Sequence, residues 1–163
     1  MNYLGIDKSS ISNGPGVRVV LWVSGCTLHC KGCQNPESWD FCAGKLFDEE
    51  AKQKLFEALN KPYIQGITFS GGHPLEMDNR NKVYQLCKEI KKNFPTKDIW
   101  LYTGYTLEDL QSYTILEYID VLVDGPYIEE QRDITLKFRG SKNQRLINVK
   151  ETLKQGKIIT IQN

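Results

Sequence analysis

Hydrophobic positions along this chain fall into two alternating patterns, short continuous runs and stripes at helical spacing. The first run, residues 17–23 (VRVVLWV), is β-branched and almost continuously apolar, as expected of a strand covered on both faces. Three later runs predict buried strands in the same way, at residues 66–70, 99–103 and 119–124. Weaker strands are expected near residues 135–139 and 157–161.

The stripes between these runs predict helices. Apolar side chains recur at i, i+4, i+7 and i+8 beyond a capping Asp48, at Ala51, Leu55, Ala58 and Leu59. A second stripe stops at Pro95 and consists of Val83, Leu86, Ile90 and Phe94. Thr106 and Asp109 fit a capping box that opens a third helix, whereas Asn148 and Gly156 fit the two ends of a short fourth one. Residues 9–16 have the composition of a loop.

Strands that alternate with helices imply right-handed crossovers and a mainly parallel sheet, so the fold class is α/β. A closed barrel of eight such units takes about 250 residues. The chain has 163 residues, which predicts a partial, open (β/α) barrel in a single domain spanning residues 1–163.

Charge and composition narrow the range of possible functions. Lysine and arginine number 21 against 20 aspartates and glutamates, and this balance offers no basic surface for nucleic acid. The N-terminal sequence lacks the features of a signal peptide, and no apolar run approaches the ~18 residues that span a bilayer. These features predict a cytoplasmic protein with no membrane partner. The five cysteines are an odd number, and the crowding of three of them favours a metal over disulfides.

Cys26, Cys30 and Cys33 form a C-x-x-x-C-x-x-C array directly after the first predicted strand. Structural zinc sites and common iron–sulfur proteins supply four ligands, but this array has three. In a four-iron, four-sulfur cluster, three cysteines would leave one iron without a protein ligand. That open iron could bind a substrate.

The other predicted strands also end in loops of unusual chemistry, at residues 70–74 (SGGHP), 103–105 (TGY), 124–126 (DGP) and 139–141 (RGS). Because ligand sites of parallel α/β folds lie at the carboxyl ends of the strands, these loops are expected to line one rim together with the cysteines. Gly71 and Gly72 would let the backbone approach a ligand, although a tight turn also explains them.

Several single residues have more than one interpretation. Cys87 lies on an apolar helix face and is interpreted as a core thiol. Cys42 is either a fourth ligand or a loop thiol without a metal, and His29 is either a zinc ligand or a solvent-facing histidine. Arg18 and Arg139 could each pair with an anion, but a solvated arginine at a strand end is the default.

Taken together, these motifs resemble the radical S-adenosylmethionine enzymes. Within that superfamily the chain is similar to the activating proteins of anaerobic (class III) ribonucleoside-triphosphate reductases, over nearly its whole length. The segments that carry the similarity are NGPGVR (13–18), SGC (24–26), KGC (31–33), DIWLYTGY (98–105), VLVDG (121–125) and RGSKNQR (139–145).

The resemblance implies a set of ligands and a reaction. Cys26, Cys30 and Cys33 would hold a 4Fe-4S cluster, and the open iron would bind the amino and carboxylate groups of S-adenosyl-L-methionine. The implied cofactor contacts are Gly32, Cys33, Gln34, Gly71, Gly72, His73, Thr103, Asp124 and Arg139. An oxidoreductase of this kind cleaves S-adenosylmethionine reductively. The 5'-deoxyadenosyl radical then generates a glycyl radical on the large subunit of the reductase, with electrons from a low-potential donor such as flavodoxin.

The chain departs from that superfamily at two positions. Gly32 stands where many members have an aromatic residue, and His73 stands where Asp or Glu usually follows the glycine pair. Because imidazole is a weaker acceptor for an ammonium group, the carbonyls of Gly71 and Gly72 and the open iron are expected to carry most of the recognition of the amino group.

Two rival functions remain open on the sequence. The first is an activating enzyme of another glycyl-radical enzyme. The second is a zinc-stabilised binding module that uses the three cysteines with His29 or Cys42. The colour of the anaerobically purified protein separates these classes, because an iron–sulfur protein is brown and a zinc protein is colourless.

Overall fold

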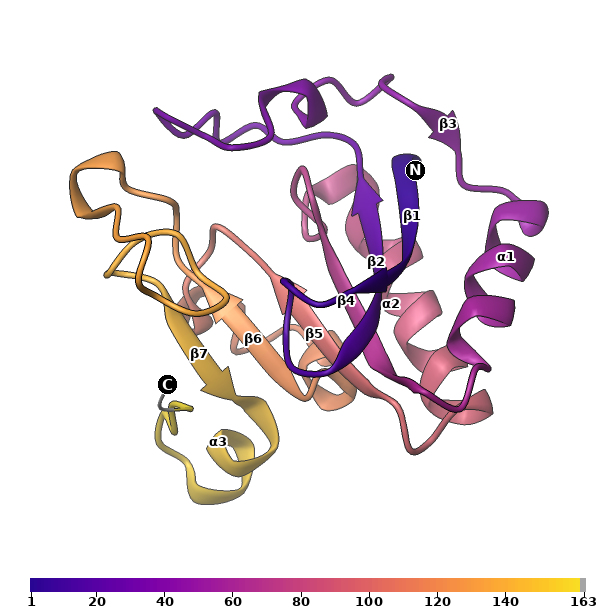
Figure 1. Cartoon of the computed structure of the whole chain (residues 1–163). Helices are drawn as coiled ribbons and strands as arrows, with labels where there is room; N and C mark the ends of the chain where they lie inside the picture. The colour runs from indigo at the N-terminus through magenta and orange to yellow at the C-terminus, as the bar shows by residue number, and fades with distance from the viewer. Residues whose placement is uncertain (162–163) are drawn as a thin grey trace.

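The computed structural model describes residues 1–161, which form a single seven-stranded sheet in the order β3-β1-β2-β4-β5-β6-β7 (Figure 1). Four central strands are parallel, namely β2 (Val17–Val23), β4 (Ile64–Gly71), β5 (Asp98–Tyr102) and β6 (Val121–Asp124). The outer strands run antiparallel to their neighbours: β1 (Asn2–Ser10), β3 (Lys45–Leu46) and β7 (Arg145–Asn148). The structure therefore confirms an open α/β sheet, parallel in its centre only.

Three α-helices connect or follow these strands. Helix α1 (Glu49–Leu59) begins after Asp48, whose side chain accepts a hydrogen bond from the Ala51 amide, as its sequence predicts. Helix α2 (Met77–Asn93) links β4 to β5. Helix α3 (Val149–Gln155) is capped by Asn148 and ends at Gly156, whose φ of 70° is left-handed. Among residues 1–161, no helix combines the length and apolar character needed to cross a membrane.

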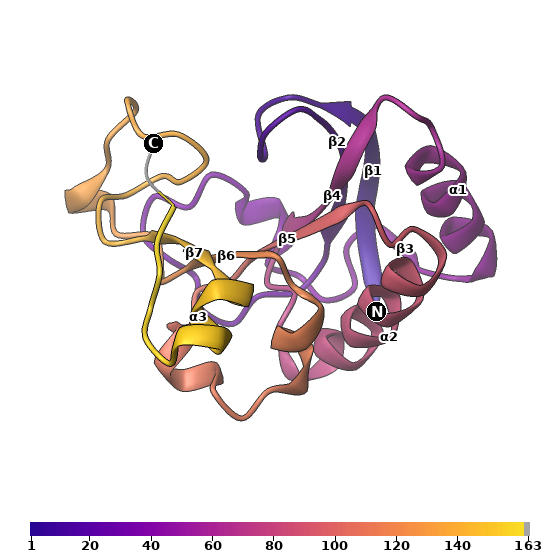
Figure 2. The same ribbon diagram turned by 90° about the horizontal axis from the view of Figure 1, so that it is seen from below.

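The main core lies between the sheet and helices α1 and α2, which cover the same face of the sheet (Figure 2). Because strand side chains alternate between faces, every second residue of β2 points into this core, namely Val19, Leu21 and Val23. Helix α2 contributes Val83, Leu86, Cys87 and Ile90. The interpretation of Cys87 as a core thiol is confirmed, since the residue is fully buried.

The opposite face of the sheet is also covered, which corrects the interpretation of Arg18 as a solvated residue. Arg18 is fully buried, donates from Nε to Thr68 and pairs with Asp98. The loop after β1 closes over it, because Pro15 and Asn13 offer their carbonyls to Arg18 and Thr68. A strand covered on both faces has no solvent side on which a charged residue can lie, so Arg18 needs these internal partners.

Four other local predictions were wrong in type or extent. The predicted third helix is a 3-10 turn at Leu107–Leu110 followed by another at Thr114–Tyr118, although the capping box of Thr106 and Asp109 is present. Residues 135–139 form no strand, because Phe138 has a left-handed φ of 64° that breaks the extended backbone. Residues 157–161 form only an isolated bridge at Thr160. The predicted loop 9–16 begins inside β1, which extends to Ser10.

Candidate functional site

The loop after β2 and the loop after β4 are bound to each other through their backbones. The amide of Gly72 donates to Val23, and the amide of His73 donates to Gly25, each at 2.8 Å. A Cβ atom added at Gly72 would lie 2.7 Å from the carbonyl oxygen of Gly25 and 2.8 Å from that of Ser38. Gly72 therefore lets these loops approach closely, and Gly71 makes the turn between strand and loop with a φ of 102°.

The three cysteines of the array lie on the long segment that crosses above the end of β2 in Figure 1. All three are half-buried free thiols. The amide of Asn35 donates to Cys33 Sγ at 3.4 Å, and the amides of Leu28 and His29 are near the Cys26 thiol. Burial raises the pKa of the Cys26 thiol, and these two amides partly oppose that shift.

Both alternative ligands of the array, His29 and Cys42, are exposed. His29 is exposed, and its ring stacks on Trp39 with the centroids 4.3 Å apart. Cys42 is exposed on the loop beyond Trp39, where its amide donates to Asp40.

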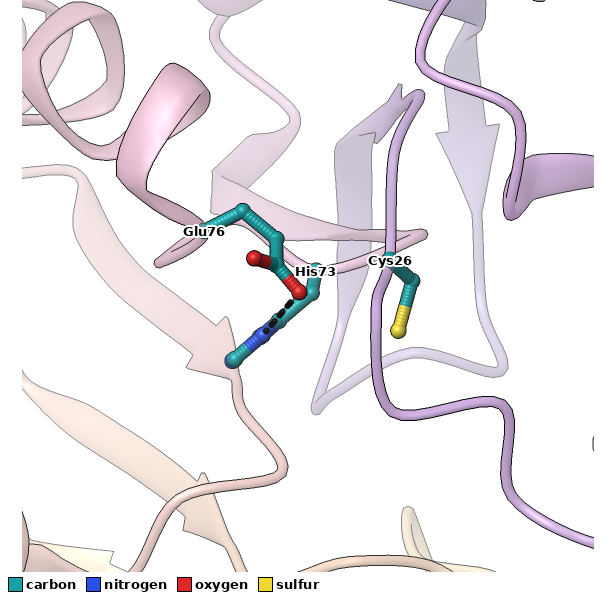
Figure 3. A group of neighbouring side chains, drawn as sticks. All are labelled: Cys26, His73 and Glu76. Atoms are coloured by element: carbon teal, nitrogen blue, oxygen red, sulfur yellow. Dashed lines mark hydrogen bonds and ion pairs between the residues drawn. The ribbon is translucent and has the colours of Figure 1, made fainter.

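A buried group that the sequence analysis did not identify lies beside the first cysteine. Within residues 1–161, one set of three potential ligand atoms lies within 4.8 Å of one another, and it belongs to Cys26, His73 and Glu76. Figure 3 shows the Glu76 carboxylate and the His73 ring together, with the Cys26 sulfur across from them on the neighbouring loop. Cys30 and Cys33 are outside this set. The only sequence signal for Glu76 was an acid three residues beyond His73.

Glu76 Oε1 accepts hydrogen bonds from the amide of Thr27 at 2.7 Å and from its hydroxyl at 2.8 Å. His73 Nδ1 lies 3.4 Å from the same oxygen. Burial alone would raise the pKa of the Glu76 carboxyl, but these donors outweigh it and the pKa lies below its ordinary value. Glu76 is thus an ionised carboxylate that links the loop after β4 to the cysteine loop.

His73 is 1% exposed and has partners at both ring nitrogens. Nε2 lies 2.8 Å from the Thr103 hydroxyl and 3.4 Å from the Gly104 amide, which can only donate. An accepting Nε2 places the proton of the neutral ring on Nδ1, facing Glu76. Burial lowers the pKa of His73, which keeps the ring neutral, and Glu76 opposes this shift in part.

The remaining predicted cofactor contacts have different surroundings. Gln34 is exposed, and Gly32, with a φ of 75°, lies against Glu129 of the segment that follows β6. Asp124 is buried, and its carboxylate accepts from the Leu107 amide and from Arg145, so its oxygens already have partners within the protein.

Arg139 is half-buried, and its Nε has no hydrogen-bond partner among residues 1–161. Of the predicted contacts, His73 is therefore hydrogen-bonded to Thr103 and lies beside Cys26, whereas Gly72 packs against Gly25. Arg139 has an unused donor.

The arrangement suits an iron–sulfur cluster chemically. Three half-buried thiols on one short loop supply soft ligands, and the Asn35 amide offers a hydrogen bond to one of the sulfurs. A structural zinc site needs four protein ligands. Among the described residues, the group of potential ligand atoms that includes Cys26 contains His73 and Glu76, and neither His29 nor Cys42.

Comparisons with known proteins agree on one family. Residues 12–147 match the model of a 4Fe-4S single cluster domain. A relative from Haemophilus influenzae is 47% identical over 148 residues, covering 88% of this chain and 96% of the relative. A relative from Enterobacteria phage T4 is 45% identical over 146 residues, covering 90% and 93%. One from Escherichia coli K12 is 39% identical over 148 residues, covering 88% and 96%. All three are named anaerobic ribonucleoside-triphosphate reductase-activating protein.

Proposed function

Because the chain belongs to the family of anaerobic ribonucleoside-triphosphate reductase-activating proteins, we propose that it activates such a reductase as a radical S-adenosylmethionine enzyme. Cys26, Cys30 and Cys33 would hold a 4Fe-4S cluster with one open iron. The cluster would pass one electron from a low-potential donor such as flavodoxin to S-adenosylmethionine, giving methionine and a radical that removes a hydrogen atom from a glycine of the large reductase subunit. The observation that carries this proposal is the three-thiol loop at the carboxyl end of β2.

The residues of the chain would bind, orient and shield this chemistry. The close approach of Gly72 to Gly25 fixes the cysteine loop against the loop after β4. His73 and Thr103 then connect that loop to the end of β5. Three neighbouring strand ends are therefore held together at one rim, as a cofactor bound across parallel strands requires.

An open sheet also suits a protein substrate. The sheet ends at the short strand β3 on one side and at β7 on the other, so it does not close into a barrel. A segment of a partner protein could reach the rim of such a sheet, whereas a closed barrel with full-length loops would restrict that access. We therefore propose the partial barrel of this superfamily as the functional architecture.

The decisive experiment is anaerobic reconstitution with iron and sulfide, followed by incubation with a reductant, S-adenosylmethionine and a candidate reductase. Electron paramagnetic resonance should detect a glycyl radical on the reductase. Omission of S-adenosylmethionine should remove the signal. A colourless protein that contains zinc and gives no radical would overturn the proposal in favour of a binding module.

Partner identity needs a separate comparison, because another glycyl-radical enzyme would give the same signal. The reconstituted protein should be offered an anaerobic ribonucleoside-triphosphate reductase and an unrelated glycyl-radical enzyme in parallel reactions. Radical formed on the reductase alone supports the proposed partner, and radical formed on the other enzyme alone refutes it.

A further inference from the structure

Glu76 is a buried carboxylate without a cationic partner from the protein. It is 6% exposed, and among residues 1–161 the one basic side chain beside it is His73, whose ring is held neutral by its other contacts. No lysine or arginine of the described chain pairs with it. Because an uncompensated buried charge is costly, such a carboxylate is expected to meet a cation when the site is filled.

The two oxygens of Glu76 have different roles. Oε1 takes both hydrogen bonds from Thr27 and faces His73 Nδ1. Oε2 accepts no hydrogen bond from the described residues. It is also not one of the solvent-inaccessible side-chain atoms that lack a partner, so it is accessible from outside the protein. One oxygen thus anchors the side chain, and the other remains available to a ligand.

The Glu76 side chain does not cap helix α2. It occupies the N-cap position of α2 but forms no side-chain capping bond to that helix. Glutamate is not among the residues that usually cap a helix with their side chain. Here the side chain turns to Thr27 on the cysteine loop instead, so its place in the site is not a by-product of helix capping.

Asn79, in the first turn of α2, holds the start of the helix against the end of β2 and the turn that carries Glu76. This buried side chain donates through Nδ2 to the carbonyl of Ser24 at 2.9 Å and to that of His73 at 3.2 Å. The turn from His73 to Glu76 is therefore bound to the end of β2, just before the cysteine array. A ligand held beside Cys26 would meet a carboxylate that is already oriented.

We propose that Glu76 binds the α-ammonium group of S-adenosylmethionine, with Thr27 and His73 as positioning residues. The inference rests on the proposed function. Of the two cationic groups in that molecule, the ammonium carries N–H donors that can bond to Oε2, and the sulfonium carries none. A potential ligand atom of Glu76 lies within 4.8 Å of one of Cys26, so the amino group would bind beside the cluster. This assignment places amino-group recognition on a side chain, in contrast to the backbone-centred recognition expected from the sequence.

The test compares ligands as well as variants. Equilibrium dialysis under anaerobic conditions should measure binding of three ligands to the reconstituted protein: S-adenosylmethionine, its analogue with hydrogen in place of the α-amino group, and S-adenosylhomocysteine, which keeps the amino group but has an uncharged sulfur. Glu76→Gln should weaken binding of both amino-bearing ligands by about 10- to 100-fold. It should change the affinity for the analogue without the amino group by no more than about twofold.

A matched control is available in the same region. Glu130 is an exposed acid that pairs with Lys31 of the cysteine loop, so Glu130→Gln removes the same charge near the same loop. It should change none of the three affinities. Cluster content of each variant is read from absorbance before binding is measured.

Several results would overturn the inference. One is wild-type affinity of Glu76→Gln for S-adenosylmethionine with the cluster intact, and another is equal weakening of all three ligands. A loss confined to S-adenosylmethionine would assign the carboxylate to the sulfonium and would also refute the proposal.

If Glu76→Gln does not retain a cluster, Glu76→Asp decides, because it keeps the charge on a shorter side chain. Selective weakening of the amino-bearing ligands supports the proposal, and unchanged affinity for all three refutes it. The proposed function fails separately, when the wild-type protein itself binds no S-adenosylmethionine.

Discussion

The Thr103 hydroxyl lies 2.8 Å from His73 Nε2, and this contact joins the loop after β5 to the loop after β4. The His73 ring also packs edge-on against Tyr105, with the ring centroids 4.5 Å apart. Position 73 is therefore a buried connection between loops. A protein with a charged imidazolium here would lose an acceptor for both Thr103 and Gly104.

This burial predicts a pH dependence of stability. The pKa of His73 is lowered in the folded protein because burial disfavours the charged ring, whereas in the unfolded chain it should be about 6.5. As pH falls below that value, the unfolded chain takes up a proton that the folded protein does not, so the free energy of unfolding should fall. Urea unfolding of the metal-free protein between about pH 7.5 and 5.5 measures this slope.

The sequence has two histidines, which allows a clean control for this slope. His73→Gln should flatten the pH dependence, because glutamine does not titrate. His29→Gln changes an exposed residue and should preserve the slope. An unchanged slope in His73→Gln would show that another group is responsible.

The buried ion pair of Arg18 and Asp98 should be costly to break. Asp98→Asn would leave the fully buried guanidinium without its counter-charge, and the expected loss in the free energy of unfolding is about 3 kcal/mol. This is near the lower end for buried pairs, because the Asp98 side chain is 29% exposed. Glu50→Gln breaks the exposed pair with Lys54 and should cost less than about 0.5 kcal/mol. Similar losses in both variants would contradict the structure.

The cysteine substitutions should separate ligands from other thiols. Cys26→Ser, Cys30→Ser and Cys33→Ser should each abolish the iron–sulfur absorbance and the radical signal, because each removes one of three ligands. Cys42→Ser changes an exposed loop thiol and should retain both. Loss of a stable cluster in Cys42→Ser would defeat the open-iron argument.

Exposure of the wild-type protein to air should also bleach its colour, since an open iron is accessible to oxidant.

A substitution at Gly72 tests the contact between the two loops. In Gly72→Ala the new Cβ would lie within 2.8 Å of two carbonyl oxygens, and backbone atoms cannot rotate away. The expected cost is about 1–3 kcal/mol in the free energy of unfolding, together with weaker retention of the cluster. Gly5→Ala on strand β1 meets no atom within 4 Å and should be nearly neutral. Equal stability of the two variants would show that the loops do not require this approach.

Short sequence patterns were sufficient to predict many of the helices and strands. The helix after Asp48 and the short helix between Asn148 and Gly156 have the predicted ends, because a cap and a left-handed glycine act within one turn of backbone. The central strands were also predictable, since a continuous apolar run suits a strand that is buried on both faces. The edge strand β7 and strand β1 were missed because their pairing depends on strands that no local sequence pattern identifies.

The sequence by itself determined the cysteine array and the α/β class, because ligand spacing and hydrophobic period are properties of neighbouring residues. Only the tertiary structure decided which charged side chains are buried and which partners they have. Arg18 forms a buried ion pair with Asp98 because the loop after β1 closes over the second face of the sheet. Glu76 joined Cys26 and His73 because the ends of β2 and β4 lie side by side, a relation set by strand pairing that no local pattern encodes.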